Sequence, residues 1–225
     1  MACVYEIASR LYQYAVSRGA KFRENGYQIF SPDMLLDSEP DEIVPFRNRL
    51  KAKDPSKTAI CFFTDDKLIF PRLDKLETDL EEYQKYMGVC GFDLSPNILT
   101  DPFRQNINVI ASQLASLYLA LNGIKIIPNF RTGGDSTIAS LQAYPRDAIF
   151  AVGTLGCARG LVAHNSLLLL KKLLVSDAKE LLVYGTLRPE YRAILEERGV
   201  RFRVYQDFQT RSRNKSKEKQ YGRES

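Results

Sequence analysis

Residues 101–127 read DPFRQNINVIASQLASLYLALNGIKII, a helix pattern followed by a strand pattern. Apolar side chains recur at steps of four and three over residues 103–121, which predicts an amphipathic helix lying against a sheet. Asp101 stands at the N-cap position, Pro102 at the first helical position, and Gly123 just after the last turn. The apolar run 124–127 then predicts a strand. The apolar helix positions are Phe103, Ile107, Ile110, Leu114, Leu117 and Leu121.

The same alternation extends along most of the chain. Further strand-like segments lie at residues 59–63, 89–92, 148–152, 181–184 and 202–205, with helical patterns between them. Strands that alternate with helices are joined by crossovers and run parallel. The sequence therefore predicts an α/β fold with a mostly parallel sheet of about six strands, either an open doubly wound sheet or a small incomplete barrel.

We expect a single domain over residues 1–208. Its first part, residues 1–57, contains an N-terminal helix over 1–14 and a long surface connection over 31–57, which is rich in Pro, Asp, Glu and Lys. Residues 58–208 contain the β/α repeats. Residues 209–225 are predicted to be a basic, disordered tail.

Composition narrows the class of protein. The 225 residues are 44% hydrophobic and 26% charged, as in ordinary globular proteins. No apolar run is long enough to cross a bilayer, and Glu6 and Arg10 interrupt the start where a secretory signal would be apolar, so we expect a cytoplasmic protein. The four cysteines form no CxxC pair, which excludes zinc knuckles and thioredoxin-like motifs. Cys61 and Cys90 lie in apolar runs and are predicted to be core residues.

Acidic and hydroxyl side chains follow the first two predicted strands of the repeats. Asp65 and Asp66 follow one strand, and Asp93 and Ser95 follow the next. Because the carboxyl ends of parallel strands share one edge, these four are the predicted catalytic residues. Asp65, Asp66 and Asp93 are also predicted ligands of Mg²⁺, which prefers oxygen donors. Turn chemistry alone also favours Asp and Ser at such positions, so both interpretations stay open.

Two glycine-rich turns are candidate phosphate sites, because backbone amides before a helix can bind an anion. Neither turn matches a P-loop or a G-x-G-x-x-G fingerprint, and glycines there also serve simply as turn residues. The predicted phosphate-binding residues are Arg131, Gly133 and Gly134 in the first turn, and Gly153, Thr154 and Gly156 in the second.

His164 is the only histidine of the chain. Paired-histidine metal sites and two-histidine relays are therefore excluded. A Ser-His-Asp triad would require His164, but no G-x-S-x-G motif accompanies it. The roles of His164 and of Cys157 stay open.

The formal charge of +5 is concentrated at the end of the chain. Residues 210–225 contain six basic and two acidic side chains, so the rest of the chain is nearly neutral. A basic tail adds sequence-independent affinity for nucleic acid, although such tails also occur on proteins that do not use them. The predicted nucleic-acid contacts are Arg211, Arg213, Lys215, Lys217 and Lys219.

Several segments, in this order and spacing, resemble an uncharacterised family of bacteria, phages and other mobile elements, the domain-of-unknown-function family 4417. They are PFRNRL at 45–50, CFFTDDKLIF at 61–70, GFDLSPNILTDP at 91–102, NGIKIIPNF at 122–130, AVGTLG at 151–156 and LLVYGTL at 181–187. The resemblance implies a phage or mobile-element origin and favours Asp65, Asp66, Asp93 and Ser95 as site residues, but it implies no mechanism. The chain departs from the family motif around Asp93 at Phe92 and Leu94. It also departs at Ala111 and Gln113 of the long helix, which in the family carries aromatic residues and arginines.

Three hypotheses for the function follow. The first is binding or processing of a phosphate-bearing or nucleotide-like small molecule at the strand-end rim, with or without Mg²⁺. The second is a non-catalytic nucleic-acid accessory protein that uses the basic tail. The third is a protein-binding adaptor or host-defence antagonist. The sequence leaves open whether the protein is an enzyme.

Overall fold

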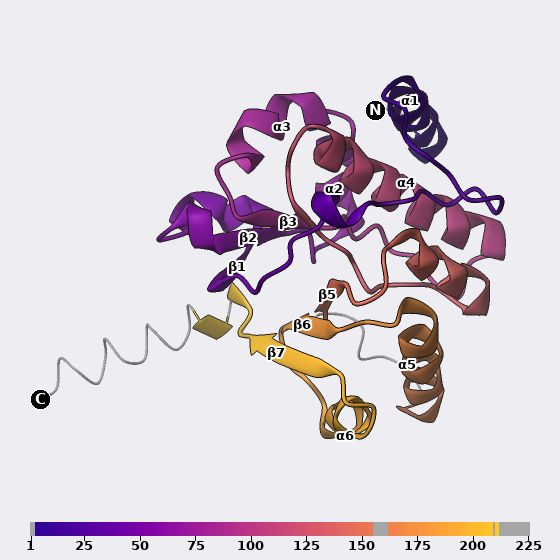
Figure 1. Cartoon of the computed structure of the whole chain (residues 1–225), viewed down its shortest axis with the longest axis vertical. Coiled ribbons are helices and arrows are strands. Elements are labelled where there is room, and N and C mark those ends of the chain that lie inside the picture. The colour runs from indigo at the N-terminus through magenta and orange to yellow at the C-terminus, as the bar shows by residue number, and fades with distance from the viewer. Residues whose placement is uncertain (1–2, 155–161, 209, 212–225) are drawn as a thin grey trace, which may run out of the picture.

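The computed structural model describes residues 3–154, 162–208 and 210–211. The chain is an α/β protein with parallel strands and an N-terminal helix, α1 (Val4–Ser17) (Figure 1). The other α-helices are α2 (Asp66–Leu73), α3 (Leu76–Tyr83), α4 (Pro102–Leu121), α5 (Val162–Ser176) and α6 (Pro189–Glu197). Short 3-10 helices are η1 (Pro32–Met34), η2 (Phe46–Lys51), η3 (Pro55–Lys57) and η4 (Asp135–Ala143). No helix in these described ranges is both long and apolar enough to cross a membrane.

The strands form two parallel sheets. The first has the order β1-β2-β3-β4 and the second β5-β6-β7, and every pairing is parallel. The predicted parallel β/α architecture is confirmed, whereas the expected single sheet of about six strands is wrong. The strands are β1 (Glu42–Pro45), β2 (Thr58–Cys61), β3 (Gly88–Cys90), β4 (Ile126–Ile127), β5 (Ile149–Gly153), β6 (Glu180–Tyr184) and β7 (Arg201–Tyr205).

Strand β1 lies inside the segment predicted to be a surface connection, residues 31–57, so that prediction is wrong there. Its Ile43 and Val44 pair in register with Ala59 and Ile60 of β2. Two apolar residues are too few to produce a strand periodicity, and β1 is ordered by pairing with its neighbour. Pro45 at its end is compatible with an edge strand.

The two sheets touch on both sides. On one side the backbone continues between them, because Asn129 forms a parallel bridge with Ala151, and Phe130 N donates to Ala151 O at 2.8 Å. At the opposite edge the contact is made by side chains, since Tyr205 Oη donates a hydrogen bond to the Pro40 carbonyl at 2.7 Å. The chain therefore visits the strands in spatial order and brings the last one back against the segment that precedes the first.

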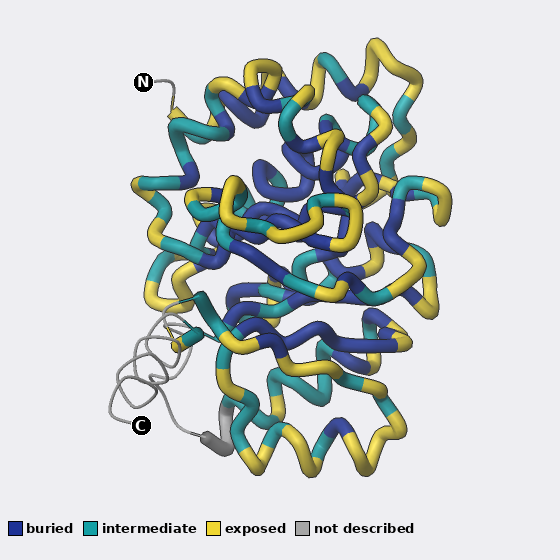
Figure 2. Tube along the Cα trace, turned by 90° about the vertical axis from the view of Figure 1, so that its left-hand side faces the viewer, coloured by how far each residue is buried: buried dark blue, intermediate teal, exposed yellow. Residues whose placement is uncertain are grey.

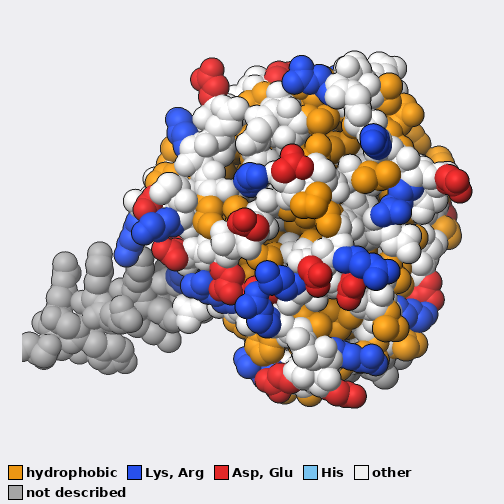
Figure 3. Space-filling view, viewed as in Figure 1, with side chains coloured by type: hydrophobic (Ala, Val, Ile, Leu, Met, Phe, Trp, Pro, Cys, Tyr) orange, Lys and Arg blue, Asp and Glu red, His pale blue; other side chains and the backbone are white. Residues whose placement is uncertain are grey.

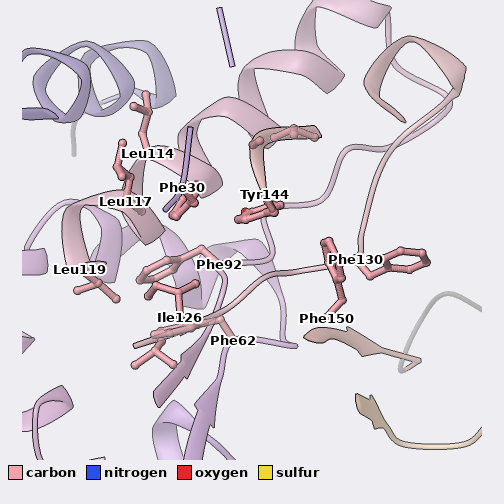
Figure 4. Packing of buried hydrophobic residues seen from close by; sticks show 14 of the residues in the cluster. Phe30, Phe62, Phe92, Leu114, Leu117, Leu119, Ile126, Phe130, Tyr144 and Phe150 are labelled. Atoms are coloured by element: carbon pink, nitrogen blue, oxygen red, sulfur yellow. The ribbon is translucent and has the colours of Figure 1, made fainter. Parts of the chain in front are cut away.

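Both faces of strands β2 to β6 are buried, as the dark central segments of Figure 2 show, whereas β7 is mostly exposed. One face contributes to a cluster with members from all seven strands. The other face packs under the helices in the larger hydrophobic cluster, where the rings of Phe62 and Phe92 lie 4.0 Å apart (Figure 4). The strand residues of the first cluster are Ile43, Ala59, Cys61, Cys90, Ile127, Ile149, Ala151, Leu182, Tyr184 and Tyr205. The predicted burial of Cys61 and Cys90 is confirmed.

Helix α4 lies between the first sheet and α1 (Figure 1). Its predicted cap is confirmed, because Asp101 Oδ1 accepts a hydrogen bond from Arg104 N at 2.9 Å. A helix with one apolar stripe would expose the side that faces away from the sheet. In this structure α1 packs on that side of α4, with the Tyr14 and Tyr118 rings 4.5 Å apart. Phe103 of the predicted stripe is instead 65% exposed in the first turn of the helix, where its ring lies 5.7 Å from that of Tyr5 of α1.

Candidate functional site

Asp93 follows β3 and is the most deeply buried of the predicted site acids, with 3% of the residue exposed. Its Oδ1 accepts a hydrogen bond from Asn129 Nδ2 at 2.9 Å, and its Oδ2 pairs with Arg131 Nη1 at 2.8 Å. Asn129 and Arg131 follow β4, the neighbouring strand. The buried carboxylate therefore links two adjacent strand ends and fixes the position of the guanidinium of Arg131, whose side chain is 28% exposed.

Burial is the main influence on the charge of Asp93 and raises the pKa of its carboxyl group above the ordinary value. Arg131 and Asn129 favour the ionised form but do not offset the burial. The nearby Asp66 carboxylate raises the pKa further. A buried acid with a raised pKa and a single charged partner is typical of functional sites, and also occurs in structural ion pairs.

Asp66 and Ser95 belong to the same rim. Asp66 begins α2, and its Oδ1 accepts a hydrogen bond from Ser95 N at 3.0 Å. The Ser95 carbonyl in turn accepts from Asn108 Nδ2 of α4 at 2.9 Å. Three of the four predicted catalytic residues, Asp66, Asp93 and Ser95, therefore lie together at the ends of β2 and β3.

Asp65 lies apart from them. Its side chain is 74% exposed, and its Oδ2 lies 3.6 Å from Lys67 Nζ in solvent. Among the residues that the structure describes, no three His, Cys, Asp or Glu side chains are grouped so as to hold a metal ion. The expected three-carboxylate magnesium site is not assembled, because Asp65 points to solvent and the Asp93 carboxylate is paired with Arg131.

A small cavity of about 20 Å³ lies beside Asp93. Its walls come from the loops after β3 and β4, from Tyr144, and from Val109, Ser112, Gln113 and Ser116 of α4. Among its lining residues only Asn129 and Arg131 are half-buried, and the others are buried. Asn129 and Arg131 therefore form its entrance.

Gln113 is the member of this site that sequence reasoning did not identify. The residue is 6% exposed, and its Nε2 donates to the Ser140 carbonyl at 2.9 Å. Its Oε1 is buried and has no hydrogen-bond partner. The available signal was the cluster of polar residues Ser112, Gln113 and Ser116 within residues 109–121, which are otherwise largely apolar.

A family model described as a domain of unknown function, DUF4417, matches residues 25–203. This chain belongs to the DUF4417 family. The predicted resemblance is thereby confirmed, and the match includes Asp66, Asp93, Arg131 and the cavity, while α1 precedes it. No curated protein and no solved structure matches the chain.

In the first glycine turn of the DUF4417 region, the backbone amides of Gly133 and Gly134 already form hydrogen bonds within the protein. Gly133 N donates to Thr137 Oγ1 at 2.8 Å, and Gly134 N donates to Gln105 Oε1 at 2.7 Å. A phosphate bound by these amides would have to replace both hydrogen bonds. Arg131 is thus the member of this turn with the stronger case as a phosphate ligand.

The second glycine turn lies at the ends of β5 and β6. Thr154 Oγ1 accepts a hydrogen bond from Thr186 N at 2.8 Å, which joins the two strand ends. Gly153 lies against Phe63, so close that a Cβ atom there would come within 2.5 Å of the ring. Gly153 is therefore needed for packing against Phe63, and Thr154 for a hydrogen bond between strand ends. Gly156 and Cys157 lie outside the described residues.

The predicted nucleic-acid residues divide into two groups. Arg211 is half-buried, donates from Nη2 to the Ile43 carbonyl at 2.9 Å and pairs with Glu42, so it belongs to the folded body and not to a free tail. Arg213, Lys215, Lys217 and Lys219 lie outside the described residues, as does the side chain of His164.

Proposed function

We propose that this DUF4417 protein binds or processes a phosphate-bearing or nucleotide-like small molecule at the rim formed by the carboxyl ends of β2, β3 and β4. The observation that carries the proposal is the pair of Asp93 and Arg131, in which a buried carboxylate orients the guanidinium of a partly exposed side chain. The planar guanidinium matches phosphate oxygens, and orienting it before the ligand arrives lowers the entropic cost of binding.

The arrangement of the strands supports a ligand at this rim. Crossovers between parallel strands are right-handed as a rule, so strands visited in spatial order put their helices on one face. The cluster with members from all seven strands then occupies the other face, which favours an incomplete barrel. In barrels and in open parallel sheets alike, ligands bind at the carboxyl ends of the strands.

Within this proposal Asp66, Asp93 and Ser95 are the residues placed to act on the ligand. Mg²⁺ is commonly bound by one or two carboxylates together with substrate phosphates. In the absence of a three-carboxylate site, such an ion would arrive with the phosphate, and Asp66 would be its protein ligand. Asp66 would then supply the only negatively charged oxygen ligand from the protein.

Isothermal titration with inorganic phosphate, AMP and ATP, each with and without Mg²⁺, tests the proposal. Arg131→Lys keeps the charge but loses the planar fork, and we expect it to weaken phosphate binding about tenfold. Arg104→Lys is the matched control, because the Arg104 side chain is 75% exposed and pairs with Asp101 at 3.4 Å, away from the cavity. Asp66→Asn should remove only the part of the affinity that depends on Mg²⁺. Failure of the wild-type protein to bind any of these ligands would contradict the proposal.

A second candidate function is association with nucleic acid through the tail. It is favoured by the concentration of basic residues beyond residue 210, whereas acidic and basic side chains are interspersed on the face of the body in Figure 3. A DNA titration over a range of salt concentrations should show a steep salt dependence for the full chain and lose it after truncation at residue 211. Equal binding by the two proteins would exclude the tail.

A third candidate is a protein-binding adaptor, which would suit a phage or mobile-element origin. Large apolar side chains are exposed beside the start of α4, with Leu99 89% and Ile98 53% exposed. A partner that is captured by the wild type, lost with Leu99→Asp and retained with Leu174→Asp would favour this candidate. Leu174 is the control because it is 71% exposed on another helix, α5. Loss of the partner from both variants would contradict a role for this surface.

A further inference from the structure

The walls of the cavity beside Asp93 are unequal in hydrogen-bond donors and acceptors. Asn129 Nδ2 already donates to the Phe92 carbonyl and to Asp93, at 3.0 and 2.9 Å. The Ser116 hydroxyl donates to the Ser112 carbonyl at 2.9 Å, and Gln113 Nε2 donates to the Ser140 carbonyl. These three donors are therefore satisfied within the protein, and the Tyr144 hydroxyl of the wall lies within hydrogen-bond reach of the Gln113 side chain.

An acceptor, by contrast, is unsatisfied. Gln113 Oε1 is buried without a hydrogen-bond partner. Exchanging the positions of the amide oxygen and nitrogen does not solve this, because the oxygen would then face the Ser140 carbonyl oxygen. An unpaired buried acceptor costs free energy that a donor from a ligand would recover. The group that enters the cavity should therefore carry N–H or O–H donors.

The charges around the cavity favour a cation among such donors. Two carboxylates, Asp93 and the neighbouring Asp66, are opposed by the Arg131 guanidinium. Asp93 Oδ1 accepts a hydrogen bond from Asn129 and Oδ2 from Arg131, and each carboxylate oxygen has two lone pairs. An ammonium group would thus meet a carboxylate and an amide oxygen at once.

We propose that the cavity receives the ammonium group of a ligand, whose anionic group stays outside at Arg131. The ligand class is a small aminoalkyl phosphate. A volume of about 20 Å³ has room for roughly one group the size of a water molecule, so the rest of the ligand lies beyond the entrance at Asn129 and Arg131. Only the phosphate half of this inference rests on the proposed function.

Three probes separate the two halves in calorimetric or NMR titrations: phosphoethanolamine, ethyl phosphate and ethylamine. We expect phosphoethanolamine to bind at least about tenfold more tightly than ethyl phosphate, because charge-assisted hydrogen bonds are worth that much or more. Equal binding of these two phosphates would overturn the ammonium inference and leave the proposed function standing. Binding of ethylamine without any binding of ethyl phosphate would support the ammonium site and refute phosphate binding.

Glutamine-to-methionine variants test the assignment to Gln113. Gln113→Met removes the acceptor, and we expect it to abolish the preference for phosphoethanolamine without changing the affinity for ethyl phosphate. Gln28→Met is the matched control, because Gln28 is also buried with an unpaired Oε1, and its Nε2 donates to the Ile110 carbonyl at 3.4 Å, but it lies outside the cavity. Should Gln113→Met fail to fold, Gln113→Glu keeps an acceptor and should retain the preference. Loss of the preference in Gln113→Glu, or its persistence in folded Gln113→Met, would overturn the inference.

Discussion

Gly153 shows how a single residue limits the packing between the two sheets. It ends β5 against the side chain of Phe63, and a Cβ atom there would lie 2.5 Å from Phe63 Cγ and 2.7 Å from Phe63 Cβ. Contacts with atoms so near the backbone cannot be relieved by rotating the ring. Glycine is therefore required for space at this position.

We expect Gly153→Ala to lower the free energy of unfolding by about 1–3 kcal/mol, because the strand or Phe63 must shift. Gly134→Ala is the control, since the added methyl would meet only Gln105 Oε1 at 3.4 Å, an ordinary contact, on an extended backbone. Urea unfolding of both variants measures the difference. Equal stability of the two variants would show that the space at Gly153 is not limiting.

Glu180 and Glu39 form a pair of carboxyl groups near the start of β6. The Glu180 residue is 2% exposed and hydrogen-bonded to Glu39, and Arg201 and Arg203 pair with the two carboxyl groups at 3.0 and 2.9 Å. Burial and the contact with Glu39 raise the pKa of Glu180 above the ordinary value. The folded state therefore binds this proton more tightly than the unfolded chain does.

Stability should consequently fall as the pH rises from about 4.5 through the raised pKa of Glu180, because the unfolded chain loses its proton first. Glu180→Gln retains a neutral donor at this position, so its free energy of unfolding should change less with pH over the same window. Urea unfolding at a series of pH values compares the two proteins. Parallel pH profiles would contradict the assignment of this proton to Glu180.

At the level of elements, α4 has its own start signal in the sequence. Asp101 Oδ1 accepts a hydrogen bond from the backbone amide of Arg104, and Pro102 occupies the first turn. We expect Asp101→Ala to cost about 1 kcal/mol of unfolding free energy and Asp101→Asn much less, because asparagine can also cap. Thermal or urea unfolding measures both. An equal loss in the two variants would assign the effect to the ion pair with Arg104 and not to the cap.

At the level of the whole molecule, the two sides on which the sheets touch differ in kind. The side between β4 and β5 is continuous backbone, whereas the side between β7 and β1 depends on side chains, among them Arg211 with Glu42 and with the Ile43 carbonyl. The side chains of this pair are 24% and 28% exposed, so solvent screens them only in part. The end of the described chain thus helps to join the first strand to the last.

A double-mutant cycle of Arg211→Met and Glu42→Gln should give a coupling free energy of about 1 kcal/mol or more. The corresponding cycle for Lys67 and Asp65 is the control, because those side chains are 78% and 74% exposed and should couple by less than about 0.5 kcal/mol. Similar values for the two pairs would mean that Arg211 contributes no more than a surface charge.

The sequence by itself determined the features that depend on neighbouring residues. The cap and extent of α4, the β/α alternation and the burial of Cys61 and Cys90 follow from local periodicity and composition, and the structure has all of them. Strand ends could also be located, which is why Asp65, Asp66, Asp93 and Ser95 were predicted at one rim and Arg131 as a phosphate ligand beside them, although Asp65 lies apart in solvent. In parallel strands, local order suffices to place such residues on a common edge.

Only the tertiary structure decided what depends on residues far apart in the chain. Pairing with β2 makes a strand of Glu42–Pro45, and packing of α1 buries the side of α4 that faces away from the sheet. The Asp93 carboxylate forms an ion pair with Arg131 and does not share a cation site with Asp65. The cavity with its unpaired Gln113 oxygen exists because loops after two strands meet one face of a helix. Side-chain direction and burial at such a junction arise from contacts between distant segments, and no local pattern encodes them.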